Sequence, residues 1–180
     1  ICVEQEIKPK FPMTGSAVGV DVGLKTFLTL STGESVENPR WFRESQAKLR
    51  KAKKSLSRKK KGSSRYVKAK VRVARIESKT ANRRKWFHHQ ITLDLVRNHD
   101  LIAVEDLNIA GMKKNRKLAK SVSDAGWGEF FRILGYKALW NDKVVIKVGR
   151  FFPSSRLCTC GVVNKDLKLS DRVWTCSACG

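Results

Sequence analysis

Half of the basic residues of this chain lie in one continuous stretch, residues 43–85. The stretch holds 19 of the 38 Lys and Arg residues and only two acids, Glu44 and Glu77, so its net charge is +17. With a net charge of +22 and 41% hydrophobic residues in 180, the chain is expected to be a folded protein that binds a polyanion.

The basic stretch predicts a hairpin of two helices. Its one clear turn signal is Gly-Ser-Ser at 62–64, so we expect helices at about 40–60 and 65–98. Apolar residues follow helical spacing along the second helix, and we expect this narrow stripe to pack while the rest faces solvent or a polyanion. The stripe consists of Val67, Val71, Ala74, Phe87, Ile91 and Leu95.

Nucleic acid is the expected partner of this hairpin. A merely solvated helix usually pairs Lys with Glu at i,i+4, whereas here the near absence of acids leaves the cations without a counter-charge. Lys and Arg bind phosphates whatever the base sequence. The residues expected to contact phosphates form the densest basic runs: Lys51, Lys53, Lys54, Arg58, Lys59, Lys60, Lys61, Arg83, Arg84 and Lys85.

A membrane partner is not expected. No apolar run approaches the roughly 18 residues of a membrane-spanning helix. Residues 1–16 contain Glu4, Glu6, Lys8 and Lys10 and lack the apolar segment of a signal peptide.

Short apolar segments on both sides of the basic stretch predict a β-sheet. The first two should form a hairpin that continues into a third strand, and a helix at about 123–140, capped by Ser123 or Asp124, should precede the last strand. Strands separated by helices favour parallel crossovers, so we expect an α/β fold with a mixed sheet and helices on its faces. The expected strands are 17–22, 26–30, 35–36, 101–106 and 144–148.

Two of these strands carry an acid near their ends, Asp21 and Glu105. If the strands are neighbours, their backbones lie about 4.8 Å apart, so two carboxylates repel and one pKa should rise. A hard divalent cation, Mg²⁺ or Mn²⁺, would remove the conflict and could support phosphodiester hydrolysis. The alternative is that both acids bind turn N–H groups or pair with a Lys.

Four of the five cysteines crowd into the last 23 residues, as C-x-C and C-x₂-C pairs. Cys158, Cys160, Cys176 and Cys179 have nearly the spacing of a four-thiolate zinc site, which is structural because all four positions are filled by protein. A Gly follows each second Cys, as a tight turn requires. The first pair is one residue shorter than usual, and a disulfide is the alternative.

Taken together, these residues resemble the TnpB (OrfB) family of nucleases encoded by insertion sequences, which are related to type V CRISPR effectors. The resemblance covers about residues 15–180. Its motifs are Gly19-Val-Asp-Val-Gly-Leu-Lys25, Glu37-Asn-Pro39, Leu56-Ser-Arg-Lys-Lys-Lys61, Ala81-Asn-Arg-Arg84, Ile102-Ala-Val-Glu-Asp-Leu-Asn108, Ser121-Val-Ser-Asp-Ala-Gly-Trp-Gly-Glu-Phe130, Phe151-Phe-Pro-Ser-Ser155 and Asp171-Arg-Val-Trp-Thr-Cys176.

The resemblance implies a ribonuclease H-like (RuvC-type) fold with a zinc ribbon, and a transposase-associated, RNA-guided DNA endonuclease activity. It implies that Asp21 and Glu105 bind Mg²⁺ or Mn²⁺, that the four Cys bind Zn²⁺, and that the partners are DNA and a guide RNA in a prokaryotic cytoplasm. The expected domains are a remnant of a preceding lobe at 1–14, a nuclease core at 15–150 and a zinc ribbon at 151–180.

The chain also departs from the family pattern. The family's third catalytic Asp is expected just after the last Cys, beyond Gly180, so we expect this chain by itself to be inactive. Trp86 stands where relatives tend to carry Asp. The alternative function is therefore a non-catalytic, nucleic-acid-binding fragment. A ribosomal or RNA-packaging protein would explain the charge and the Cys residues but not two acids embedded in apolar strands.

Overall fold

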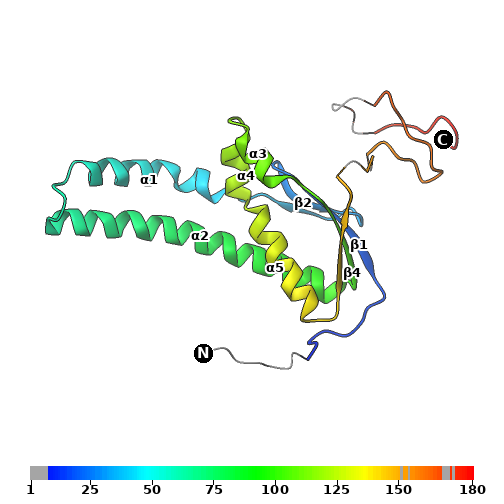
Figure 1. Ribbon diagram of the computed structural model, residues 1–180, viewed down its shortest axis with the longest axis horizontal. Helices are drawn as coiled ribbons and strands as arrows, with labels where there is room; N and C mark the ends of the chain where they lie inside the picture. Colours follow the sequence, from blue (N-terminus) through cyan, green and yellow to red (C-terminus); the bar gives the residue numbers. More distant parts are fainter. Residues whose placement is uncertain (1–7, 151, 154, 168–170, 172) are drawn as a thin grey trace.

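The protein is a mixed α/β structure with one five-stranded sheet (Figure 1). The computed structural model describes residues 8–150, 152–153, 155–167, 171 and 173–180, so residues 1–7 of the expected preceding lobe lie outside the described part. The strands are β1 Ala17–Val22, β2 Thr26–Leu30, β3 Ser35–Glu37, β4 Leu101–Glu105 and β5 Val144–Val148. The helices are α1 Trp41–Ser57, α2 Ser64–Asn98, α3 Ile109–Lys114, α4 Ala119–Ala125 and α5 Trp127–Leu139.

The strand order is β3-β2-β1-β4-β5, which confirms the expected mixed sheet. The first three strands are antiparallel neighbours, whereas β1–β4 and β4–β5 are parallel. Parallel pairing requires long crossovers. The hairpin of α1 and α2 makes the first crossover, and the segment from α3 to α5 makes the second.

Helices α2 and α5 pack against one face of the sheet. Every second residue of β1 and β4 is buried there, for example Val20 and Val104, together with Leu95 of α2 and Phe130 of α5. The alternation follows from the two-residue period of a strand. The residues of the opposite face are open to solvent, as the 53% exposure of Val144 shows. Residues that point to this second face are therefore available to a ligand.

The predicted helical hairpin is confirmed with small shifts of its boundaries. It projects away from the sheet as a two-helix arm (Figure 1). Ser63 begins α2 as its N-cap and accepts a hydrogen bond from Tyr66 N at 3.2 Å. Gly62 supplies the positive φ of 83° that the preceding turn needs.

The predicted apolar stripe is wrong in the first half of α2. Val67 and Val71 are 53% and 42% exposed, and Ala74 is exposed as well. The face that packs against α1 instead carries Val73 and Ile76. Both stripes have helical spacing, so periodicity could not distinguish them, and only the direction from which α1 approaches selects the buried one.

The predicted helix at 123–140 is in fact two helices, α4 and α5, that meet at Gly126. Gly126 has a φ of 69°, and a Cβ at this position would lie 3.1 Å from side-chain atoms of both Arg84 and His88. A non-glycine residue is disfavoured here on both grounds. The predicted cap residues are therefore part of α4 rather than of the start of α5. Asp124 instead accepts a hydrogen bond from Phe42 N at 3.0 Å and so stabilises the start of α1.

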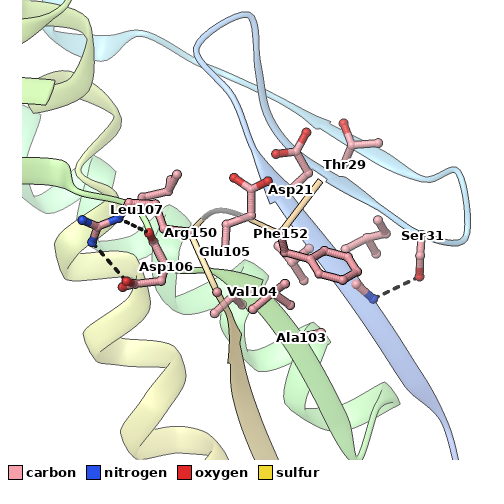
Figure 2. Close-up of a pocket in the computed structure, with 15 residues that line it drawn as sticks. Asp21, Thr29, Ser31, Ala103, Val104, Glu105, Asp106, Leu107, Arg150 and Phe152 are labelled. Atoms are coloured by element: carbon pink, nitrogen blue, oxygen red, sulfur yellow. Dashed lines mark hydrogen bonds and ion pairs between the residues drawn. The ribbon is translucent and has the colours of Figure 1, made fainter. Parts of the chain in front are cut away.

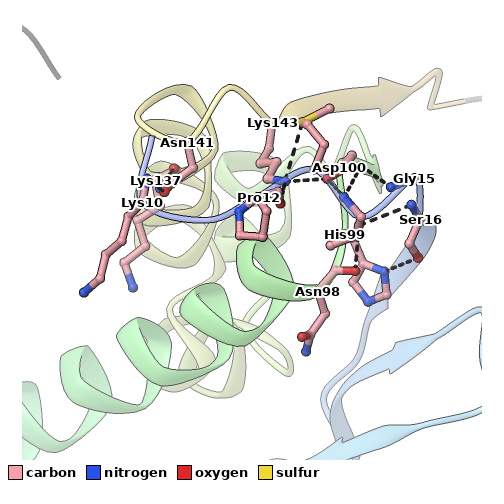
Figure 3. Close-up of polar contacts among 12 residues, drawn as sticks. Lys10, Pro12, Gly15, Ser16, Asn98, His99, Asp100, Lys137, Asn141 and Lys143 are labelled. Atoms are coloured by element: carbon pink, nitrogen blue, oxygen red, sulfur yellow. Dashed lines mark hydrogen bonds and ion pairs between the residues drawn. The ribbon is translucent and has the colours of Figure 1, made fainter. Parts of the chain in front are cut away.

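A polar network fixes the segment before β1 to the N-terminal end of β4 (Figure 3). Asp100 accepts hydrogen bonds from Thr14 N and Gly15 N and forms an ion pair with Lys143. The Lys143 side chain is fully buried and also donates to Pro12 O at 2.6 Å. These contacts hold the pKa of Asp100 down at about 2, chiefly through the hydrogen bond from Lys143.

No helix in the described part of the chain combines the length and the apolar character needed to cross a bilayer.

Candidate active site, thiol cluster and basic surface

The two acids predicted from the strand ends lie together at one end of the sheet. The parallel register pairs Val20 with Val104, so the next residues, Asp21 and Glu105, are neighbours on the same face. That face is the one opposite to α2 and α5. Figure 2 shows both carboxylates side by side at the ends of β1 and β4. Parallel strands place their carboxyl ends at the same edge of a sheet, which is why positions so distant in sequence meet here.

A cavity of about 410 Å³ opens between these strands. Its lining comes from the ends of β1, β2, β4 and β5 and from the turn that follows β5. Besides the two acids, the lining includes Gly19, Thr29, Ser31, Ala103, Asp106, Arg150 and Phe152.

The electrostatics of the cavity disfavour two ionised acids. Burial against the surrounding protein raises the pKa of Asp21. Burial also raises the pKa of Glu105, and the charge of Asp21 raises it further. Within the described residues no ion pair neutralises either group, which argues against the alternative that they are ordinary strand-end acids paired with a Lys. A divalent cation would relieve this repulsion, and two carboxylates on adjacent rigid strands suit a hard cation.

Asp106 also lines the cavity but is already engaged. Its carboxylate receives Arg150 Nη2 at 3.0 Å, and its carbonyl oxygen accepts from Arg150 Nε at 3.1 Å. The pair ties the turn after β5 to the end of β4. Sequence reasoning gave Asp106 no role, although its position directly after Glu105 was a signal that it would lie at the same end of the sheet.

Sequence reasoning also did not predict three further lining residues of the cavity, Thr29, Ser31 and Phe152. Thr29 pairs with Asp21 across the antiparallel register, and the alternation of a strand places the two on the same face. Phe152 was part of a family motif that had been given no role. No sequence pattern could bring the turn after β5 to the ends of β1 and β4 before the strand order was known.

The four predicted cysteines form a compact cluster of free thiols. Their Sγ atoms all lie within 4.8 Å of one another. Cys158 is 3.4 Å from Cys179, and Cys160 is 3.6 Å from Cys176. These distances are far beyond the roughly 2.05 Å of a disulfide and close to the edge of about 3.8 Å that a tetrahedron with 2.3 Å metal–sulfur bonds requires. The disulfide alternative is therefore wrong, and the thiols fit a tetrahedral metal ion.

The short C-x-C pair does not keep Cys160 out of the cluster. Gly161 N donates to Cys158 O at 2.9 Å and closes a tight turn, in which Gly161 has a φ of 89°. Cys158 N donates to Val162 O, and an antiparallel β-bridge between Leu157 and Val163 supports the turn. The backbone N–H of Cys160 lowers the pKa of Cys158 to about 6, while the contact with Cys158 raises the pKa of Cys179 to about 12, so without a metal the thiolate forms first at Cys158.

The predicted phosphate-binding residues divide into two groups. Three have partners within the protein: Lys53 pairs with Glu77 at 2.7 Å, Arg83 pairs with Glu44 at 3.2 Å, and Arg84 donates to the carbonyls of Ser123 and Asp124. Arg84 is therefore partly a structural residue that holds the end of α4. The other seven have no ion pair within the described residues and face solvent. They are Lys51, Lys54, Arg58, Lys59, Lys60, Lys61 and Lys85.

Comparisons with known proteins agree on one family. Residues 1–116 match the OrfB_IS605 family, described as "Probable transposase", and residues 127–180 match the Cas12f1-like TNB domain. A protein of Streptomyces pristinaespiralis named "Putative RNA-guided DNA endonuclease" is 43% identical over 98% of this chain and 44% of its own length. "Putative RNA-guided DNA endonuclease InsQ" of Escherichia coli K12 is 33% identical over 98% of this chain and 48% of its own length. The chain thus spans less than half the length of these curated relatives.

Solved structures support the fold. The chain superimposes on a Cas12f1 chain from a complex with sgRNA and target DNA, with a TM-score of 0.53 and 16% identity over 86% of this chain and 41% of the other. A CRISPR-Cas12f ternary complex gives a TM-score of 0.55, also with 16% identity, over 93% of this chain and 35% of the other. At this identity the comparison establishes a Cas12f-like fold.

Proposed function

This chain belongs to the OrfB_IS605 family, and on that premise we propose that it is the nuclease core of an RNA-guided DNA endonuclease. The observation that carries the proposal is the pair of Asp21 and Glu105, two carboxylates with raised pKa on adjacent parallel strands. The proposed architecture is ribonuclease H-like (RuvC-type), with the α1–α2 hairpin as an insertion and the cysteine-containing segment as a zinc ribbon.

Asp21 and Glu105 would hold Mg²⁺ or Mn²⁺ at the mouth of the cavity. Such an ion, when bound, activates water and stabilises the charge that develops on a scissile phosphate. The protein itself contributes the fixed positions of the two carboxylates. The two carboxylates project from hydrogen-bonded neighbouring strands, so their separation is fixed before any ligand arrives. Their raised pKa values mean that cation binding also removes an unfavourable repulsion.

The exposed cations of the α1–α2 hairpin would bind the backbone of a nucleic acid. The relatives' names and the solved complexes suggest which one: a duplex of guide RNA and target DNA. Sequence choice would then come from base pairing, and the protein would supply contacts that do not depend on sequence. The seven Lys and Arg residues without an ion pair in the described structure are the best candidates for phosphate contacts, because no internal ion pair has to break when they bind.

The four thiols would bind Zn²⁺ and stabilise the segment that follows β5. This role is structural because the four thiols complete the tetrahedron, so no position is left for a substrate. The short turns of the segment bury little apolar surface of their own, and a metal is a common replacement for a core in such small units.

A cleavage assay tests the catalytic proposal. We would compare this chain with a version extended through the coding sequence that follows residue 180, each supplied with Mg²⁺ or EDTA and a DNA substrate. The expected result is an inactive short form and a Mg²⁺-dependent long form that loses activity on Asp21→Ala. Cleavage that survives both Asp21→Ala and Glu105→Ala would refute the assignment. Trp140→Ala, outside the cavity, is the control.

The second candidate function is nucleic-acid binding without catalysis. It is favoured by the engagement of Asp106 with Arg150, since this leaves only two unpaired carboxylates in the described cavity. Under this alternative the extended form binds nucleic acid but cleaves none in the presence of Mg²⁺ or Mn²⁺.

A further inference from the structure

We propose that Phe152 is a stacking platform for one nucleobase of a single-stranded DNA beside the Asp21–Glu105 pair. The inference rests on the proposed function for its substrate class and adds a base-binding subsite to the metal-binding one. It concerns a residue that lines the cavity and has no role in holding a metal.

Phe152 is a large apolar side chain that the described structure leaves 52% exposed. Exposed apolar residues are common singly, but this one lines the same cavity as both carboxylates. Figure 2 shows its ring close to Asp21 and Glu105, on the side of the cavity that Ser31 also lines. It is the one aromatic ring among the described lining residues.

The segment that carries Phe152 is held in place by contacts with the end of β4. Arg150 binds both the carboxylate and the carbonyl oxygen of Asp106, and Asp106 N donates to Val148 O at 3.1 Å. Phe152 N donates to Gly149 O at 2.9 Å, which closes the turn. The backbone at Phe152 is therefore anchored beside the cavity before a ligand binds, and such preorganisation reduces the entropy lost on binding.

The cavity has room for a flat group beside the ring. Gly19 and Ala103 are its small residues on β1 and β4, and an added Cβ at Gly19 would approach only Ser31, at 3.5 Å. The hydroxyl of Ser31 is itself engaged, since it accepts from Gly19 N at 3.0 Å. The volume of about 410 Å³ falls within the range of ligand pockets.

The chemistry of the cavity favours a nucleotide over other ligands. Two unneutralised carboxylates repel an anion unless a cation lies between them. A phosphate can therefore lie beside Asp21 and Glu105 only when a cation is bound there, and the Phe152 side of the cavity suits an uncharged group. Arg150 is the cation of the lining, and it is occupied by Asp106. Stacking on an aromatic ring accepts every base. It therefore suits an enzyme whose sequence choice comes from a guide.

The test compares two single-stranded oligonucleotides of equal length, oligo-dT and a fully abasic backbone, bound to this chain in Mg²⁺, so that a cation can neutralise the two carboxylates. The wild-type chain should bind oligo-dT about 5- to 150-fold more tightly, the range for stacking of one base. Phe152→Ala should lose this preference while the salt dependence of its binding stays the same, because the phosphate contacts remain. Phe152→Trp should keep it.

Controls separate stacking from other effects. Phe152→Leu keeps an apolar side chain without a π-face, so a variant that retains the whole preference overturns the inference. Trp140→Ala removes another exposed aromatic residue, one that does not line the cavity, and should behave like wild type. Absence of a dT preference in the wild type also overturns the inference, and would indicate that a protein segment covers Phe152.

The inference and the proposed function can fail separately. Asp21→Asn should abolish Mg²⁺-dependent cleavage by the extended form and leave the dT preference intact. Cleavage that depends on Asp21 without a dT preference refutes the stacking subsite alone. A dT preference without such cleavage refutes the catalytic proposal and leaves the subsite standing.

Discussion

The two ends of strand β4 place carboxylates in opposite electrostatic states. At the N-terminal end, Asp100 is paired with the buried Lys143, and its pKa is lowered to about 2. At the C-terminal end, Glu105 lies beside Asp21 without a cation, and the pKa of each is raised. One short strand thus separates a carboxylate whose charge stabilises the fold from two whose charges do not.

This difference distinguishes an end of the strand that stabilises the fold from an end that we propose binds a cation. The Asp100 end fixes residues 12–15 to the sheet through hydrogen bonds and an ion pair. The Glu105 end keeps an unfavourable charge arrangement that a cation would relieve. Perturbed carboxylates in a cavity are typical of functional sites.

Lys143→Met should lower the free energy of unfolding, because it removes a buried ammonium group that pairs with Asp100 and donates to Pro12 O. Urea denaturation measures the change. Lys147→Met is the matched control, an exposed Lys on strand β5, which begins directly after Lys143, and it should shift stability by no more than about 0.5 kcal/mol. Equal effects of the two variants would show that the Asp100 end does not stabilise the fold in this way.

Mg²⁺ should raise the thermal stability of the wild-type chain but not that of Asp21→Asn. A cation at 100 times its dissociation constant stabilises the folded state by about 2.7 kcal/mol. Differential scanning calorimetry across a Mg²⁺ titration measures the shift, and Asp142→Asn, an exposed acid outside the cavity, serves as the control. An equal shift in wild type and Asp21→Asn would mean that the cation binds elsewhere.

Asp21→Asn by itself should raise the melting temperature slightly in the absence of metal at neutral pH. The substitution removes a charge that burial disfavours and that repels Glu105. The gain should be at most about 1 kcal/mol, since the site is open to solvent and water screens the charges. A lower melting temperature would show that the carboxylate of Asp21 stabilises the fold instead.

The pH dependence of stability should have opposite signs at the two ends. The pKa of Asp100 is below its usual value of 3.8, so its contribution is present above pH 3.8 and is lost as the pH falls towards 2. Asp100→Asn should therefore flatten the acid limb of the profile. The pKa of Asp21 is above 3.8, so the gain from Asp21→Asn should be largest at neutral pH and vanish below 3.8. Melting temperatures measured from pH 2 to 7 test both signs.

Much of the fold could be predicted from local patterns. The strands at 17–22, 26–30 and 144–148 have the predicted bounds, and the mixed sheet follows from the alternation of helices and strands. The sequence-based predictions were wrong where packing against another helix determines the local structure. Gly126 interrupts a continuous helical pattern with its φ of 69°, and the nearby Arg84 and His88 of α2 leave little room for a side chain there. The exposed Val67 and buried Val73 have equivalent spacing, and only the approach of α1 distinguishes them.

The sequence indicated the acids and the cysteines of the candidate sites, but not the other residues that line the cavity. Asp21, Glu105 and the four cysteines are residue types whose chemistry is visible in sequence, and their positions at strand ends and in short pairs indicated a use. Arg150 and Phe152 carry no such signal. They reach the cavity only because β5 lies next to β4 and the turn after it folds back onto Asp106.

The sequence by itself determined where the charge lies, which segments form strands and which side chains could bind a metal, because these depend on residue type and short-range spacing. Only the tertiary structure decided that positions 21 and 105 are neighbours, that Asp106 is paired with Arg150, and that Phe152 lines the same cavity as the two carboxylates. The physical reason is that strand order and register arise from packing the whole sheet against α2 and α5. No local segment contains that information.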